Sequence, residues 1–401
     1  MDDLLSWGGI IARMLQQFWP VWAALIVTFA LSITFKRKLG LYGKLFDSPV
    51  GMIGFGIVMF WIFTAVFADL IITFDPIAQL SSLKNKVPGT PLPDVEGQWY
   101  LLGSDHLGRD VFSRVVMGAR RVLMIAPAAT AFAFMVGVTL GLPAGYFGGQ
   151  FDTVLSFLAN LVLAFPVILL FYLLVTPEIK ETGAAFTIPW TGTVWRSSIP
   201  NVMAAVLFVF PLIFFCTLFQ SRYFTLPARR NLYIGITLAI GLWAYSGLAF
   251  NADPTGLWGM DPNLLNVFVS VVFVNSPTVF RIVRGLVMDL KSRDYVAASQ
   301  TRGEGPWYIM LWEILPNARG PLIVDFCLRI GYTTILLGTL GFFGLGVSPE
   351  SPDWGSTIDD GRKLLPAGIL HPAVAPALAL MTLVLGLNLL ADGLREESLK
   401  D

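Results

Sequence analysis

Long apolar stretches constrain the fold of this chain more than any other feature of its sequence. A helix needs about 20 mostly apolar residues to cross the hydrocarbon core of a bilayer, about 30 Å thick, because each residue rises about 1.5 Å. Nine stretches qualify, more than a soluble core explains, so the sequence predicts an all-α polytopic membrane protein. The expected spans are roughly 18–35, 51–73, 122–146, 153–175, 203–220, 232–250, 264–282, 321–346 and 373–391.

The composition agrees with lipid as the main solvent. Hydrophobic residues make up 55% of the chain and charged residues 13%, with a mean hydropathy of +0.69. Soluble domains carry about 25% charged residues. Lys plus Arg and Asp plus Glu are equal, at 27 each, so no basic surplus points to nucleic acid as a partner.

Cysteine and histidine usage points to neither a disulfide nor a metal site. Cys216 and Cys327 lie in or near separate apolar stretches, where cysteine behaves as a small hydrophobic residue. His106 and His371 are far apart and have no partners at metal-ligand spacing, so no bound metal is expected.

Basic residues set the expected orientation. Lys36, Arg37 and Lys38 follow the first span, and positively charged loops stay in the cytoplasm. The N-terminus is therefore expected outside, and both the loop 283–320 and the C-terminus in the cytoplasm. The outside loop 74–121 carries six basic residues and counts against this assignment, but the rest of the pattern outweighs it. The opening Met-Asp-Asp lacks the positive region of a signal peptide, so the first span is expected to remain as a helix.

The stretch GSDHLGRDVFSRVVMGARRVL at 103–123 leads into the third span. Val111, Val115 and Gly118 share one helical face, and Arg114 and Arg121 lie on another. This pattern is typical of a helix along the membrane interface. The plainer alternative is a helix that only anchors the span after it.

Inside that span, Gly137, Gly141 and Gly145 recur every four residues. Small residues one turn apart let two helix backbones approach closely in lipid, so this face is expected to pack tightly against another helix. Incidental glycines in a flexible helix are the alternative, and the pattern indicates no activity by itself.

Asp325 and Arg329 are two charges four residues apart inside the expected span 321–346. Charges are costly in hydrocarbon, and they usually pair with each other or line a wet interior. A local ion pair is the plain interpretation, and a place on a translocation pathway is the sharper one.

A hydrophilic stretch, RDYVAASQTRGEGPWYIMLWEILP, interrupts the apolar pattern at 293–316. Ser292 is expected to cap a helix that has Asp294 in its first turn. Gly303 should break this helix, and Pro306 should begin a second one with an apolar face. That face would comprise Tyr308, Leu311, Trp312 and Leu315.

Small side chains at Ala297, Ala298 and Ser299 leave the first of these helices with little bulk. Another protein could dock closely on such a surface. A loop that merely connects two spans is the alternative that the residues leave open.

The same stretch resembles the cytoplasmic signature of bacterial ABC-importer permeases, E-A-A-x-x-x-G, nine residues, then I-x-L-P. The register fits Ala297-Ala298-Ser299, Gly303 and Glu313-Ile314-Leu315-Pro316, with departures at Ala297, Ser299 and Glu313. In the family this loop holds the coupling helix that inserts into a cleft on the ATPase subunit. By resemblance, the residues expected to couple to the ATPase are Arg293, Asp294, Ala297, Ala298, Ser299, Gln300, Arg302, Gly303, Leu315 and Pro316.

Further stretches are similar to oligopeptide/dipeptide permeases, the C-type half of the permease pair. The 103–123 stretch looks like G-T-D-x-x-G-R-D-V-x-S-R-x-x-x-G-A-R, and LGFFGLGVSPESPDWG at 340–355 is similar to L-S-F-L-G-L-G-V…W-G. GYFGGQFD at 145–152 and ADGLRE at 391–396 also match. The periplasmic family motif then comprises Gly103, Asp105, Gly108, Arg109, Asp110 and Arg114.

The resemblance implies a type I ABC importer permease in the bacterial inner membrane, with a core of six transmembrane helices to which this chain adds about three. The expected partners are a second, B-type permease, two ABC ATPase subunits, a periplasmic solute-binding protein and membrane lipid. This chain has no G-x-x-x-x-G-K-[ST] loop, so ATP and Mg are expected in the ATPase subunits, and the chain itself is expected to be non-catalytic.

The same resemblance predicts that the chain consists of four parts. Residues 1–48 would be an extra helix with a basic loop, and 49–175 the first part of the core with a periplasmic loop at 75–121. Residues 176–263 would be an insertion with a periplasmic loop and a transmembrane hairpin. Residues 264–401 would complete the core and carry the coupling loop.

Two other classes of function stay open on the residues alone. A secondary transporter driven by an ion gradient would show inverted repeats and broken helices, and no convincing repeat is found. An enzyme acting on lipids would need a polar cluster, for which His106 with Asp105 and Asp110 is the candidate. The family carries dipeptides, oligopeptides, cell-wall fragments, opines and metal chelates, so resemblance gives a peptide or peptide-like solute without fixing which one.

Overall fold

The computed structural model describes residues 4–38, 40–93, 97–175, 185–187, 194–196, 198–250, 252, 255, 262–345 and 350–398. Contacts between Cα atoms divide the chain into two units, Met1–Pro127 with Ile323–Asp401 and Ala128–Leu322. Two long helices, α6 (Val111–Phe147) and α17 (Arg319–Phe342), contribute residues to both units.

The first unit contains, besides the first part of α6 and most of α17, short elements and three long apolar helices. They are α1 (Trp7–Gln17), α2 (Trp19–Phe35), η1 (Lys36–Lys38), α3 (Gly40–Lys44), η2 (Leu45–Asp47), α4 (Pro49–Val66), α5 (Ala68–Ile71), η3 (Ser81–Leu83), β1 (Thr90–Pro91), β2 (Trp99–Tyr100), α18 (Trp354–Arg362), η5 (Leu365–Ala367) and α19 (His371–Ser398). The strands β1 and β2 pair antiparallel, with Thr90 opposite Tyr100.

The second unit contains the rest of α6 and the helices that follow it. They are α7 (Gly149–Ala164), α8 (Val167–Val175), β3 (Ala185–Thr187), β4 (Val194–Arg196), α10 (Ile199–Leu207), α11 (Val209–Arg222), α12 (Pro227–Phe250), α13 (Pro262–Leu290), α14 (Asp294–Thr301), α15 (Pro306–Tyr308), the π-helix η4 (Ile309–Ile314) and α16 (Leu315–Asn317). The strands β3 and β4 form an antiparallel pair.

The prediction of an all-α polytopic membrane protein is confirmed. Among the described residues, eight helical segments are long and apolar enough to cross a membrane, and the pair α7–α8 would be a ninth. α10 and α11 together form one of these segments, from Ile199 to Arg222. Leucine, isoleucine, phenylalanine and tryptophan side chains are exposed along α2, as expected for a helix in lipid.

The expected span 153–175 is not one continuous helix. α7 and α8 are bent by 87° at a short break. Phe165, at the end of α7, has extended backbone angles, φ −78° and ψ 134°. The following residue is Pro166, whose ring disfavours the helical conformation in the residue before it, so the sequence itself ends α7 here.

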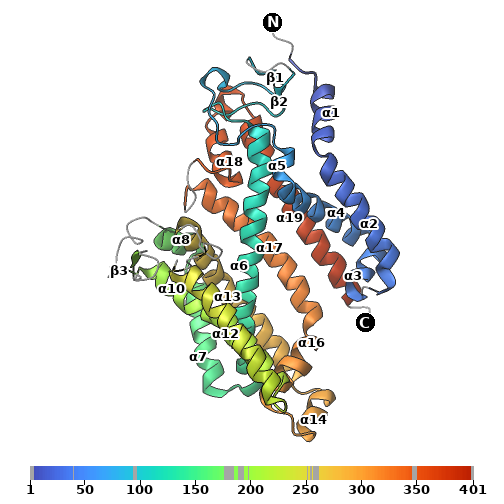
Figure 1. The fold of residues 1–401 in the computed structure, drawn as a ribbon, viewed down its shortest axis with the longest axis vertical. Coiled ribbons are helices and arrows are strands. Elements are labelled where there is room, and N and C mark those ends of the chain that lie inside the picture. Colours follow the sequence, from blue (N-terminus) through green and yellow to red (C-terminus); the bar gives the residue numbers. More distant parts are fainter. Residues whose placement is uncertain are drawn as a thin grey trace. The chain divides into compact units, whose positions relative to one another are not determined.

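The 103–123 stretch is helical only from Val111 onward, and it fits the plainer alternative, a helix continuous with the span that it anchors, not a separate interfacial helix. Residues 103–110 form a non-helical loop closed by a β-bridge between Ser104 and Asp110, and α6 then runs unbroken for 37 residues from Val111 (Figure 1). Arg114 lies in its first turns with none of its surface exposed, instead of facing the headgroup region. A buried arginine requires polar partners, and Ser351 and Thr357 are among those of Arg114.

The glycine face of α6 packs as predicted, against α13. A Cβ atom built on Gly137 would lie 2.5 Å from a methyl carbon of Val279, and one on Gly141 would lie 2.9 Å from Cβ of Val283. Such distances are shorter than van der Waals contact, so only glycine permits this approach. Residues of both helices belong to one buried cluster of the second unit.

Glycines also determine the packing of α4 along α19 in the first unit (Figure 1). A Cβ atom on Gly393 would lie 2.4 Å from Cα of Gly51, and one on Gly54 would lie 2.3 Å from the backbone nitrogen of Leu390. The backbones touch, which gives a structural reason for the glycine in the ADGLRE stretch.

Candidate functional site

The hydrophilic segment 293–316 folds into α14, a bend, α15 and a π-helix. Asp294 lies in the first turn of α14 as predicted, but the cap is Arg293, which makes no side-chain cap hydrogen bond. The hydroxyl of Ser292 instead donates backward to the carbonyl oxygen of Asp289 at 3.2 Å, so the prediction of a Ser292 cap was wrong.

The bend after α14 is a left-handed helix end. Gly303 has φ +78°, a region that favours glycine. Its N–H donates to the carbonyl oxygen of Gln300 at 2.9 Å, and the N–H of Glu304 donates to that of Ser299 at 3.2 Å. These two bonds form a Schellman motif, which satisfies the free carbonyl groups at the end of the helix.

One face of α14 is open to solvent in the chain by itself. Among the residues expected to contact an ATPase, Ala297 and Ala298 are exposed, and so are Gln300 and Gly303. Arg293, Asp294, Arg302 and Pro316 are exposed as well, and Leu315 is partly buried. The small-residue surface expected from the sequence is therefore accessible.

Ser299, the remaining member of that set, is fully buried and belongs to an internal network. Its hydroxyl donates to Oε1 of Glu313 at 2.9 Å, and the Arg302 guanidinium donates to the same oxygen at 2.9 Å. Arg302 also donates to the Ser299 hydroxyl at 2.7 Å. Ser299 and Glu313 are two of the positions that depart from the ABC-importer signature, and the structure shows that they contact each other.

The π-helix η4 changes the apolar face that was expected after Pro306. Ile309, Met310, Leu311 and Ile314 are buried. Tyr308 and Trp312, which the α-helical period placed with Leu311, are only partly buried. A π-helix advances about one residue more per turn than an α-helix, so it rotates the buried face, and no sequence period indicates this.

The segment is fastened to the end of α6, within the second unit. The Gln300 side-chain amide donates to the hydroxyl of Tyr146 at 3.2 Å, and the ammonium group of Lys291 donates to the carbonyl oxygen of Gly145 at 2.8 Å. Arg284 of α13 forms an ion pair with Asp152 of α7. The GYFGGQFD stretch is thus part of the support for α14.

A second polar cluster forms around the 103–114 motif, within the first unit. The Asp105 carboxylate accepts from the backbone N–H of Arg109 at 3.0 Å and from its guanidinium at 2.6 Å. Arg109 also donates to Asp360 of α18 at 2.9 Å. Asp105 and Arg109 are each 1% exposed, so this ion pair is buried and fully engaged.

Gly103 and Gly108 have φ of +74° and +80°. A Cβ atom on Gly108 would lie 2.1 Å from the carbonyl oxygen of Leu80, and one on Gly103 would lie 2.5 Å from that of Lys86. Both the backbone conformation and the lack of space require glycine at these two positions of the motif.

Arg114 joins the start of α6 to the 350–357 region. Its guanidinium donates to the carbonyl oxygens of Ser351 at 3.0 Å and Pro76 at 3.3 Å, and to the Thr357 hydroxyl at 3.2 Å. Next to it, the indole N–H of Trp354 donates to the carbonyl oxygen of Val115 at 2.8 Å. Residues 346–349 of the 340–355 stretch lie outside the described residues.

Asp110 is buried and accepts hydrogen bonds at one oxygen. The N–H and hydroxyl of Ser113 donate to Oδ2 at 2.9 and 2.6 Å, and the Thr73 hydroxyl donates to it at 3.2 Å. The other oxygen, Oδ1, has no hydrogen-bond partner among the residues that the structure describes. Burial raises the pKa of Asp110 to about 6, although these hydrogen bonds act in the opposite direction.

Asp325 and Arg329 form the local ion pair, with 2.6 Å between Nε and Oδ2. Arg329 is 8% exposed. The geometry fits the plain interpretation of these residues. The pathway role stays a prediction.

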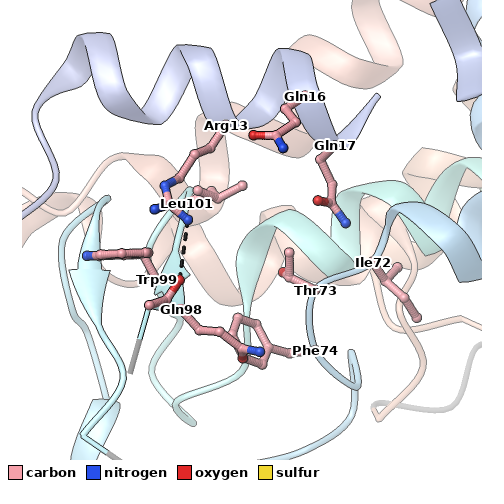
Figure 2. Close-up of a pocket in the computed structure, with 10 residues that line it drawn as sticks. Arg13, Gln16, Gln17, Ile72, Thr73, Phe74, Gln98, Trp99 and Leu101 are labelled. Carbon is pink, nitrogen blue, oxygen red and sulfur yellow. Dashed lines mark hydrogen bonds between the residues drawn. The ribbon is translucent and has the colours of Figure 1, made fainter. Parts of the chain in front are cut away.

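A polar cavity of about 330 Å³ lies between α1 and the loops near Thr73 and Trp99 (Figure 2). The Arg13 guanidinium stacks 3.8 Å from the centroid of the Trp99 ring and donates to the carbonyl oxygen of Gly97 at 3.3 Å. Through these contacts Arg13 links α1 to the loop that contains Gly97 and Trp99. No group of three His, Cys, Asp or Glu side chains that could hold a metal ion occurs among the described residues.

Sequence reasoning missed the long-range partners in both clusters. Asp360 and Thr357 lie about 250 residues from the arginines they bind. Ser221 binds Trp312 across 91 residues. One sequence alone carries no signal that pairs such positions.

Comparison with known proteins gives the same class throughout. Residues 232–396 match the family described as binding-protein-dependent transport system inner membrane component. The dipeptide transport system permease protein DppC of Alkalihalophilus pseudofirmus is 27% identical over 355 residues, which cover 88% of this chain and 87% of that protein. The di/tripeptide transport system permease protein DppC of Pseudomonas aeruginosa is 26% identical over 368 residues, 91% and 93% of the two chains.

A relative named for another solute is equally similar. The glutathione transport system permease protein GsiD of Pectobacterium atrosepticum is 28% identical over 295 residues, which cover 74% of this chain and 70% of that protein. Permeases named for dipeptides, di/tripeptides and glutathione therefore resemble this chain to a similar degree.

Proposed function

We propose that this chain, whose residues 232–396 match the family of binding-protein-dependent transport permeases, forms half of the translocation pathway of an ATP-driven importer for peptides or peptide-like solutes. The solute class comes from the names of the relatives, which include dipeptide, di/tripeptide and glutathione permeases. Their similar identities to this chain give no reason to prefer one of these solutes.

The observation that supports coupling to an ATPase is the exposed face of α14. Small side chains at Ala297 and Ala298 are accessible, whereas Val296 of the same helix packs in the buried cluster that includes the π-helix. The chain has no phosphate-binding loop of the G-x-x-x-x-G-K-[ST] type, so ATP and Mg would bind a partner. That partner would contact α14.

The motion follows from how α14 is connected. α13 leads into α14, and the π-helix and α16 lead from it into α17. When two ATPase subunits close on ATP, a push on α14 would tilt these spans as rigid bodies about the bend. A second, B-type permease would supply the other half of the pathway, and a periplasmic binding protein would deliver the solute.

The other two classes of function receive less support. The relatives are named transport system permeases, and the matched family is binding-protein-dependent, which favours an ATP-driven importer over a transporter driven by an ion gradient. The carboxylate of Asp105 is engaged by Arg109, so the cluster suggested for a lipid enzyme is a structural one. We propose a non-catalytic subunit in the bacterial inner membrane, with the N-terminus outside and the C-terminus in the cytoplasm.

An Ala298→Arg substitution tests the docking surface. The variant places a long, charged side chain on the exposed small-residue face, where a closely packed partner would clash with it. We expect ATP-dependent peptide uptake by reconstituted transporter to fall at least about tenfold, equivalent to about 1.4 kcal/mol of binding free energy. Co-purification of the ATPase subunits should fall in parallel.

The matched control is Ala12→Arg, since Ala12 is an exposed alanine on α1, far from α14 in sequence. This variant should take up solute like the wild type. Normal uptake and normal ATPase co-purification by Ala298→Arg would refute α14 as the docking surface.

A further inference from the structure

The end of α11 contacts the hydrophilic segment 293–316. The family resemblance did not predict this contact. The indole N–H of Trp312 donates to the hydroxyl oxygen of Ser221 at 3.1 Å. That hydroxyl in turn donates to the carbonyl oxygen of Leu218 at 3.0 Å, which orients it to accept. A side chain of α11 therefore holds the edge of the Trp312 ring.

Arg222 holds the face of the same ring. Its guanidinium carbon lies 4.8 Å from the centroid of the Trp312 ring, within the range of a cation–π interaction. The last two residues of α11 thus contact one indole from two directions. Such a pair of contacts restricts both the position and the tilt of the ring.

Apolar side chains of α11 extend this contact. Phe214 and Leu218 pack against the buried cluster that includes Ile309, Met310 and Ile314 of the π-helix. The π-helix is where the segment departs from regular helical geometry, and such departures frequently mark functional sites. α11 therefore supports the irregular part of the segment.

The bend next to the π-helix borders open space on the α11 side, although Ser299 and Arg302 link α14 to Glu313 of the π-helix across it. A cavity of about 580 Å³ separates the end of α11 from the residues that follow α14. Ser221 and Phe224 lie on one wall, and Gly303, Pro306 and Tyr308 lie on the other. The structure thus combines a π-helix held by α11 with a bend that borders a cavity.

We propose that Trp312 is a positioning residue for energy coupling, held by Ser221 and Arg222 of α11. It would fix the π-helix so that movement of α14 at the Gly303 bend is passed to α17 instead of being absorbed within the segment. This inference rests on the proposed function. It gives a role to the first helix of the 199–250 hairpin, which precedes the matched family region at 232–396.

Two substitutions remove the same hydrogen bond from opposite sides. Trp312→Phe keeps an aromatic ring for Arg222 but removes the N–H, and Ser221→Ala removes the acceptor. In the transporter reconstituted with its ATPase subunits and binding protein, we expect each to lower the solute transported per ATP hydrolysed by about fivefold, a typical effect of one lost hydrogen bond. The double variant should be no worse than either single variant, because both lose one shared contact.

Controls separate coupling from folding. Trp7→Phe makes the same change at a tryptophan of α1 that is 68% exposed, and Ser246→Ala removes a hydroxyl that donates within α12 to the carbonyl oxygen of Trp243 at 2.8 Å. Both should keep the wild-type ratio. Ser221→Thr retains a hydroxyl and should restore the ratio, whereas a merely structural role would change only the amount of assembled complex.

Unchanged transport per ATP in Ser221→Ala and Trp312→Phe complexes that still bind the ATPase would overturn the inference and leave the proposed function standing. If Trp312→Phe does not assemble, the Ser221→Ala ratio alone decides. A wild-type chain that binds no ATPase would overturn the proposed function itself.

Discussion

Buried charges in the 103–114 motif show how single residues hold this fold together. The Arg109 guanidinium donates hydrogen bonds to Asp105 and Asp360, and Asp105 also accepts a hydrogen bond from the backbone N–H of Arg109. Removing one partner from such a pair leaves a buried charge and costs about 3–5 kcal/mol. These contacts give a structural reason for Asp105 and Arg109 in the motif.

Asp110 gives a prediction about pH at the residue scale. Its pKa is raised to about 6 in the folded chain, against about 3.9 in an unfolded one. Between pH 4 and pH 6 the folded state holds a proton that the unfolded state has lost, so stability contributed by this group falls as pH rises. The loss is complete above about pH 6 and amounts to roughly 2–3 kcal/mol.

Asp110→Asn removes this titration and keeps an oxygen to accept from Ser113 and Thr73. Thermal unfolding midpoints of both proteins in detergent, from pH 4 to pH 7, measure the effect. The difference between wild type and variant should shift in favour of the variant as pH rises. A difference that is constant across this range would contradict the raised pKa.

Close helix packing gives a prediction at the scale of elements. A Cβ atom on Gly141 of α6 would lie 2.9 Å from Val283 of α13, whereas one on Gly285 would have nothing within 4 Å. Alanine favours a helix interior by about 1 kcal/mol over glycine at both positions. Gly141→Ala and Gly285→Ala therefore differ only in whether the added methyl group meets a neighbouring helix.

We expect Gly141→Ala to destabilise the protein by about 1–3 kcal/mol through overpacking, and Gly285→Ala to be neutral or stabilising. Thermal unfolding of the two variants in detergent tests this. Equal midpoints would show that α6 and α13 do not pack as closely as the structure has them.

The same scale shows what the sequence can and cannot predict. Hydropathy predicted the spans, because run length and bilayer thickness are linked. The spacing of Gly137, Gly141 and Gly145 predicted their face, and Gly303 and Pro306 predicted the bend. The π-helix and the bond from Trp312 to Ser221 could not be predicted, because the first lacks a period and the second joins distant residues.

At the scale of the whole molecule, the bent pair α7–α8 decides the topology. Between Gln98 and Gln300 the described chain has four helical segments able to cross a membrane, plus this pair, bent by 87°. If the pair crosses the membrane, five crossings put the two glutamines on opposite sides. If it re-enters on the same side, four crossings put them on one side.

We predict opposite sides, because the basic residues after α2 place the N-terminus outside and α14 must reach a cytoplasmic ATPase. Gln98 and Gln300 are both exposed, so each can be replaced by cysteine in a chain whose Cys216 and Cys327 have been changed to serine. In intact spheroplasts, a membrane-impermeant maleimide should label Gln98→Cys and not Gln300→Cys until the membrane is permeabilised. If both cysteines are labelled from outside, α7–α8 is a re-entrant loop and α14 cannot reach a cytoplasmic ATPase. If neither cysteine is labelled from outside, the 74–121 loop lies in the cytoplasm and its outside assignment is wrong.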